Sequence, residues 1–64
     1  MSMAEAEQYI RQLRGMVFTA AYVSNVSGIQ LAICVNACQA LFIRGEIRIV
    51  TQHSATHLVE YAFN

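Results

Sequence analysis

The stretch MVFTAAYVSNVSGIQLAICVNACQALFI, residues 16–43, contains no charged side chain. A run of this length can be a membrane span, the buried core of an assembly, or a surface that binds another molecule. The chain has 64 residues, of which 56% are hydrophobic and 12% charged, whereas ordinary domains carry about 25% charged residues. A domain this small buries only about 60% of the surface of its unfolded chain. We therefore expect residues 1–64 to form one small domain that is stable as a homo-oligomer, either a dimer or a higher assembly.

The residues around the start of this run predict a helix followed by a strand. Ser2 and Glu5 have the spacing of a capping box, and Gly15 has the residue type that commonly ends a helix. These signals predict a first helix over 3–14. The β-branched and aromatic residues of 16–23 then favour a strand, although the same segment can also be a continuation of the helix.

A second helix is predicted within the uncharged run. Ser27 and Gln30 repeat the capping-box spacing and favour a helix over 28–44. At 100° per residue, its polar residues Gln30, Asn36 and Gln39 do not gather into one solvated stripe. A helix that is apolar nearly all round is expected to be buried nearly all round, and a small sheet covers only one side of it. The other side requires a second chain or lipid.

A β-hairpin is predicted for the end of the chain. The segments EIRIVTQ, 46–52, and HLVEYAF, 57–63, alternate in their side-chain pattern as strands do. The intervening HSAT, 53–56, lacks the residues that favour tight turns, so a single helix over 46–61 is the alternative. The expected fold is a small α+β domain of helix, strand, helix and hairpin, and the alternative is a mainly α domain.

Large apolar side chains supply the candidates for a binding surface. On the second helix they are expected to occupy core or interface positions, and on the strand they are expected to form a second exposed patch. The helix candidates are Leu31, Val35, Leu41 and Phe42, and the strand candidates are Phe18 and Tyr22.

The composition favours a binding protein over an enzyme or a strongly cationic protein. Net charge is zero and the chain has four arginines and no lysine, so neither nucleic acid nor a membrane surface is the expected partner. Cys34 and Cys38 lie in a run expected to be buried, where a thiol is a poor nucleophile. We expect a non-enzymatic regulator, inhibitor or assembly factor that needs no cofactor, binds another protein and resides in the cytoplasm, because no signal-peptide pattern opens the chain.

A zinc-binding module is one alternative. Cys34, Cys38, His53 and His57 are separated by three, fourteen and three residues, and this pattern resembles a stretched two-Cys, two-His zinc finger. The interval between Cys38 and His53 exceeds the family's usual interval of about 12 residues. If Gly45 reverses the chain, the cysteines and histidines lie too far out of register to share one tetrahedral ion. No metal site is therefore predicted.

A DNA-binding regulator is a second alternative. The segment AAYVSNVSGIQLAICVNA, 20–37, followed by RGEIRIV, 44–50, and LVEYAF, 58–63, resembles the helix-turn-helix and closing hairpin of small Cro-type phage repressors. This resemblance implies a transcriptional regulator. Asn25 stands where such motifs have their turn glycine, and few residues of the second helix can touch bases.

A small membrane protein is the third alternative. The uncharged run is long enough to span a bilayer, but SNVSGIQ, 24–30, places polar side chains near its middle. Arginines flank the run on both sides, so they give no positive-inside bias. A membrane span is therefore not favoured.

Overall fold

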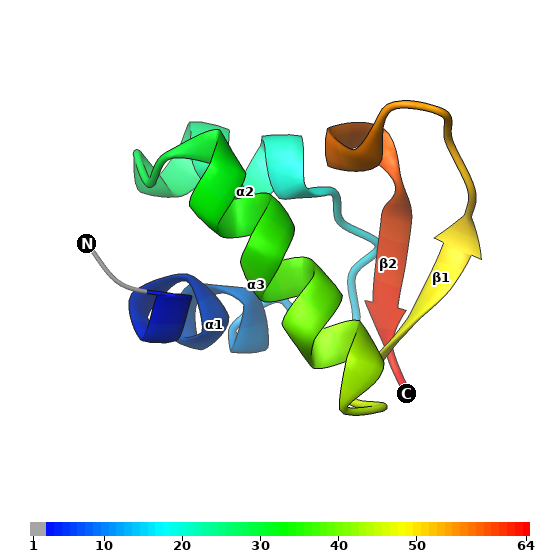
Figure 1. The fold of residues 1–64 in the computed structure, drawn as a ribbon. Coiled ribbons are helices and arrows are strands. Elements are labelled where there is room, and N and C mark those ends of the chain that lie inside the picture. The colour runs from blue at the N-terminus through cyan, green and yellow to red at the C-terminus, as the bar shows by residue number, and fades with distance from the viewer. Residues whose placement is uncertain (1–2) are drawn as a thin grey trace.

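The computed structural model describes residues 3–64 and shows three helices followed by a two-stranded antiparallel hairpin (Figure 1). This arrangement confirms the expected α+β class. The elements in chain order are α1 (Met3–Arg11), α2 (Ala20–Ser27), α3 (Leu31–Ile43), β1 (Ile47–Thr51), the short 3-10 helix η1 (Thr56–Leu58) and β2 (Glu60–Phe63).

Helix α1 packs along α3 through the side chains of Ala6 and Ile10, which are fully buried. The helix ends at Arg11, three residues earlier than expected, because residues 12–15 form a turn. Gly15 follows with φ 84°, a left-handed conformation that glycine adopts without steric cost. Ser2 of the expected capping box lies outside the described residues.

The strand expected over 16–23 was wrong for most of its length. Only Phe18 pairs with the sheet, through a bridge to Tyr61, and Ala20 already begins α2. Thr19 caps this helix: its Oγ1 accepts a hydrogen bond from the Tyr22 N–H at 3.0 Å. The cap and the two alanines that follow it favour a helix here more strongly than the aromatic residues favour a strand.

A three-residue turn, 28–30, joins α2 to α3 as a helix-turn-helix. Gly28 adopts φ 75°, and its N–H donates to the Ser24 carbonyl, which ends α2. Ser27 is therefore the last residue of α2 rather than the cap of α3, and its Oγ donates to the Val23 carbonyl at 2.6 Å. Helix α3, which corresponds to the second helix expected from the sequence, begins at Leu31, three residues later than expected.

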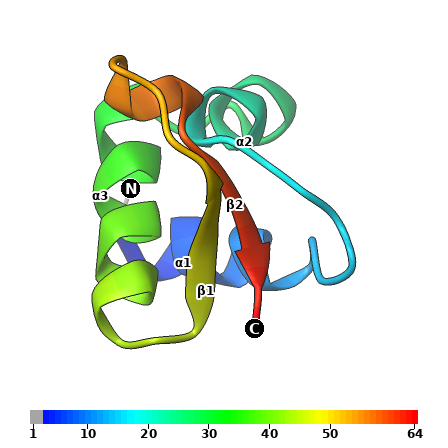
Figure 2. The same ribbon diagram turned by 90° about the vertical axis from the view of Figure 1, so that its right-hand side faces the viewer.

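The C-terminal hairpin is confirmed, and the alternative of one helix over 46–61 is wrong. Ile47 pairs with Phe63 and Ile49 with Tyr61, and an irregularity in register follows Ile49. The connection between the strands contains η1 instead of a tight turn, which accounts for the missing turn residues. Figure 2 shows the segment that contains Phe18 beside β2, on the side away from β1.

The core lies between the three helices and the inner face of the hairpin. Helix α3 contributes the side chains of one face, and α1, α2 and both strands close over them. The aromatic rings of Phe18, Phe42, Tyr61 and Phe63 approach one another, with the centroids of Phe18 and Tyr61 6.1 Å apart. The buried residues are Ala6, Ile10, Leu13, Phe18, Ala20, Val23, Ile29, Cys34, Ala37, Cys38, Leu41, Ile47, Val59 and Tyr61.

Candidate interaction surfaces

Helix α3 buries one face and leaves the other open. Cys34, Ala37 and Leu41 face the core with no exposed surface. The opposite side carries large apolar groups that remain in contact with solvent. Ile43 is 82% exposed and Phe42 42% exposed. As expected, residues 3–64 of a single chain do not cover α3 on all sides.

The open side of α3 carries no charge. No acidic residue lies in its first turn and no basic residue in its last turn. Asn36 and Gln39 are exposed and supply uncharged hydrogen-bonding groups among the apolar ones. We define the outer face of α3 as Leu31, Ala32, Val35, Asn36, Gln39, Phe42 and Ile43, which are exposed or half-buried. Low charge is typical of the centre of a protein interface.

The expected interface residues fall into two groups. Leu31, Val35 and Phe42 lie along one side of α3, at spacings of four and seven residues, and are half-buried or exposed. Tyr22 is exposed on α2 rather than on a strand. The second group, Leu41 and Phe18, belongs to the core.

An ion-pair cluster joins α1 to the turn between α3 and β1. Arg11 contacts Glu46 at 3.2 Å and Glu7 at 3.7 Å, while Arg44 contacts Glu7 at 2.6 Å and Glu46 at 3.5 Å. The hydrogen bond to Glu7 and its charge raise the pKa of the Arg44 guanidinium. Arg14 lies over a phenylalanine ring of β2. These contacts tie Arg11, Arg14 and Arg44 to neighbouring side chains of the fold.

The cysteines are structural core residues. Cys34 and Cys38 are free thiols, and their side chains are buried. Burial raises the pKa of both thiols, that of Cys38 to about 12, and the nearby Cys34 adds to the effect on Cys38. A thiol with so high a pKa stays protonated at neutral pH and is a weak nucleophile.

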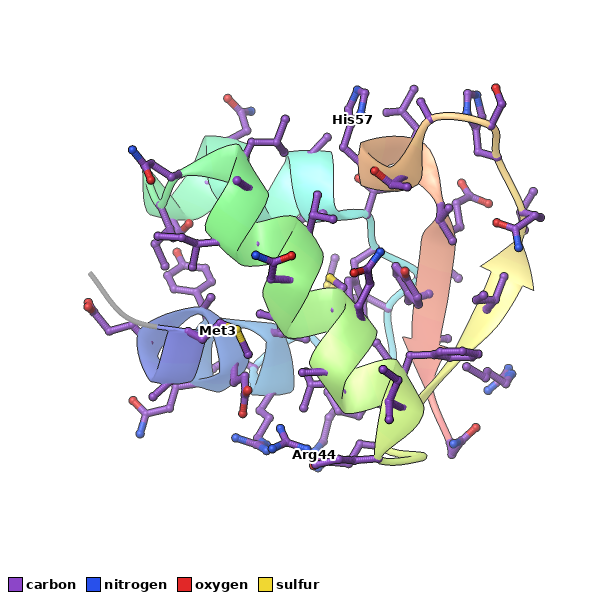
Figure 3. All side chains as sticks on the ribbon, viewed as in Figure 1. Met3, Arg44 and His57 are labelled. Atoms are coloured by element: carbon purple, nitrogen blue, oxygen red, sulfur yellow. The ribbon has the colours of Figure 1, made fainter. Side chains whose placement is uncertain are left out.

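The described residues contain no group of three or more histidine, cysteine, aspartate or glutamate side chains that would hold a metal ion. The cysteines of the zinc-finger pattern lie on α3 inside the core. His53 is exposed in the connection between the strands, and His57 belongs to η1 (Figure 3). The pattern in the sequence therefore does not correspond to a cluster in space.

A cavity lies beside the segment that joins α1 to α2, and no pattern in the sequence indicated it. It has a volume of about 190 Å³ and is lined by Met16, Val17, Phe18, Thr19, Tyr22 and Glu60. Its position results from the extended backbone at Phe18 and from the helix that starts immediately after it. Recognising Thr19 as an N-cap would have placed Tyr22 on a helix, one turn beyond the extended segment.

Within residues 3–64, no helix has both the length and the apolar composition that crossing a membrane requires. The chain matches none of the family models, curated proteins or solved structures with which it was compared.

Proposed function

We propose that this chain is a non-enzymatic protein-binding module that acts as a homodimer through the outer face of α3. The observation that carries the proposal is the exposure of Leu31, Phe42 and Ile43 on a helix with no charged residue. Exposed apolar groups gathered on one face mark protein interaction sites. The role we assign is regulatory, as an inhibitor or an assembly factor.

A second copy of the chain suits this face for two reasons. In a twofold dimer the same patch of each chain meets itself, so any charged side chain in it comes close to a copy of the same charge. The outer face of α3 has no charged side chain and therefore no such repulsion. The amides of Asn36 and Gln39 can also hydrogen-bond across the twofold axis, because each is both a donor and an acceptor. A helix of 13 residues is about 20 Å long, enough for a helix-against-helix contact.

A non-catalytic role is supported by the state of the reactive groups. The thiols are buried and protonated, and Glu7 and Glu46 are held by arginines. His53 uses its Nδ1 to accept a hydrogen bond from the Ala55 N–H. Free thiols also suit a reducing compartment, so we place the protein in the cytoplasm.

The dimer is tested by Ile43→Asp. The side chain of Ile43 is already exposed in the single chain, so aspartate should leave the fold intact. In the dimer it would bury an unpaired carboxylate, which costs several kcal/mol, or roughly a hundredfold or more in the dissociation constant. Sedimentation equilibrium should give twice 7.1 kDa for the wild type and 7.1 kDa for the variant.

Gln12→Asp is the matched control, because it adds the same charge at an exposed position of the turn after α1. We expect it to remain a dimer. Far-ultraviolet circular dichroism should show the same helix content in all three proteins. A wild type that is monomeric at high concentration, or an Ile43→Asp variant that dimerises normally, would rule out this interface.

A second candidate function, DNA binding, is favoured by the helix-turn-helix and the hairpin after it. In the resemblance to Cro-type repressors Asn25 takes the place of the turn glycine; in the structure the glycine between the two helices is Gly28, three residues later. Gln30, Asn36 and Gln39 are exposed, and such amides can read adenine in the major groove.

The distribution of charge weighs against this second function. Arg44 lies at the C-terminal end of α3, whereas bases are read mainly from the N-terminal part of a recognition helix (Figure 3). If the chain reads DNA, fluorescence anisotropy with duplex DNA should show binding that weakens steeply with salt and that Gln30→Ala, at the N-terminal end of α3, reduces. We expect no measurable binding even at low salt, and a salt-dependent complex would favour the repressor function over the protein-binding one.

A further inference from the structure

The chain has an open sheet edge at Val17. The neighbouring residue Phe18 donates its N–H to the Tyr61 carbonyl at 2.9 Å and accepts from the Tyr61 N–H at 2.8 Å. Backbone groups of successive residues in an extended chain point to opposite sides. The N–H and C=O of Val17 therefore point away from β2, and within residues 3–64 no backbone hydrogen bond engages either group.

The edge is short, because helix α2 begins only three residues after Val17. The carbonyl of Thr19 already accepts the N–H of Val23 at the start of α2. The N–H of Thr19 points to the same side as the groups of Val17. A strand laid along this edge can thus form a pair of hydrogen bonds with Val17 and a further one with Thr19.

An apolar cavity lies directly beside the open edge. Its walls include Met16, Val17 and Tyr22, which are 44%, 52% and 42% exposed. A cavity of about 150 Å³ holds one benzene molecule, so a volume of about 190 Å³ accommodates one ring-sized apolar side chain. The edge supplies backbone pairing and the cavity supplies a pocket for one side chain of the same partner.

Glu60 gives this site a charge. It lines the cavity and is half-buried. Glu7 and Glu46 are paired with arginines, but within the described residues Glu60 has no arginine or histidine within ion-pair distance. The complementary group on a partner is a lysine or an arginine.

We propose that the Val17 edge binds an extended peptide segment of a partner protein, which adds to the sheet as a further strand. The segment carries an apolar side chain for the cavity and a basic side chain for Glu60. Because side chains two residues apart lie on the same face of a strand, these two residues are separated by one. Strand addition of this kind combines main-chain hydrogen bonds with pockets for alternate side chains.

The peptide site is independent of the proposed dimer. Figure 2 shows α3 on one side of the hairpin and the segment that contains Val17 on the other. A dimer formed through α3 therefore leaves the Val17 edge open, and each chain of the dimer presents one peptide site. The two proposals fail separately: Ile43→Asp tests the dimer and leaves the peptide site unchanged.

The probe is a short, capped polythreonine peptide that contains one lysine and, two residues further on, one phenylalanine. Threonine favours an extended backbone. In a titration monitored by amide chemical shifts, we expect perturbations at Val17, Thr19 and Tyr22 with a dissociation constant of about 1 mM or lower. Hydrogen exchange of the Val17 amide should slow as the peptide is added.

Two variants separate the charge from the cavity. Glu60→Gln keeps the shape of the side chain and should weaken binding about fivefold at low salt, and replacing the peptide's lysine by glutamate should weaken it at least as much. Tyr22→Ala removes one wall of the cavity and should weaken binding about tenfold. Val26→Ala is the control, because Val26 lies on the same helix, is 43% exposed and does not line the cavity.

The proposal is overturned if no peptide of the set perturbs the Val17 amide, or if neither Glu60→Gln nor Tyr22→Ala changes the affinity for the peptide. Perturbations confined to the outer face of α3 would also overturn it. A further outcome is that the Val17 amide exchanges slowly without peptide, and more slowly as the protein concentration rises. That result would show that a second copy of the chain occupies the edge, and it would contradict a peptide partner.

Discussion

Leu41→Ala is expected to lower the free energy of unfolding by about 2–5 kcal/mol. Leu41 has no exposed surface and lies on the buried side of α3, the helix that packs against α1, α2 and β1. Removing its branched end leaves a cavity that this small core cannot easily refill. A domain of 64 residues has a total stability of about 3–10 kcal/mol, so this one substitution removes a large part of it. Urea unfolding monitored by circular dichroism measures the loss.

Leu58→Ala is the matched control, since it deletes the same atoms from a leucine that is 39% exposed on η1. We expect a loss of less than about 1 kcal/mol there. Measurements at several protein concentrations separate the stability of the chain from that of the dimer. Equal losses at the two leucines would contradict the assignment of Leu41 to the core.

The sequence predicted the class of fold because its strongest patterns were local. The alternation of Ile47 and Ile49 with polar residues was sufficient for the hairpin, and Gly45 marked the end of α3 to within one residue. The strand predicted for 16–23 was wrong because β-branched and aromatic residues indicate a partly buried surface rather than a particular backbone conformation. One threonine cap and two alanines outweighed them.

The position predicted for the start of the second helix was wrong for a related reason. The capping-box spacing makes Gly28 the first residue of the predicted helix, although glycine is a poor helix former, unfavourable by about 1 kcal/mol relative to alanine in a helix interior. In the structure Gly28 instead uses φ 75° to end α2. The hydroxyl of Ser27 donates to the Val23 carbonyl and accepts from the Ile29 N–H. Interpreting Gly28 as a stop would have predicted two short helices and the helix-turn-helix directly.

The candidate surfaces were less predictable than the fold. The uncharged character of α3 was visible in the sequence, and it correctly indicated a face that one chain does not cover. The periodicity could not show which side of α3 faces the core, so Leu41 and Phe42 were grouped together although they point in different directions. The cavity beside Val17 depends on the bridge between Phe18 and Tyr61, which are 43 residues apart in the chain, and no local pattern encodes that contact.

Alkaline pH should destabilise this protein strongly, because its core contains two thiols. Burial raises the pKa of Cys38 from an ordinary value of 9.0 to about 12 in the folded chain, and it raises the pKa of Cys34 as well. The unfolded chain releases these protons near pH 9, whereas the folded chain retains them. The stabilisation is therefore complete below pH 9 and is lost progressively as the pH rises towards 12. For Cys38 alone the loss amounts to about 4 kcal/mol at most.

Tyr61 acts in the same direction, because burial raises the pKa of its hydroxyl above the ordinary value of 10.0. Urea midpoints measured from about pH 8 to about pH 11 should therefore fall steeply. Cys38→Ala removes one of the titrating groups, so this variant should be less stable at neutral pH, yet its midpoint should fall less with rising pH. A variant whose midpoint falls as steeply as that of the wild type would show that Cys38 is not the group responsible.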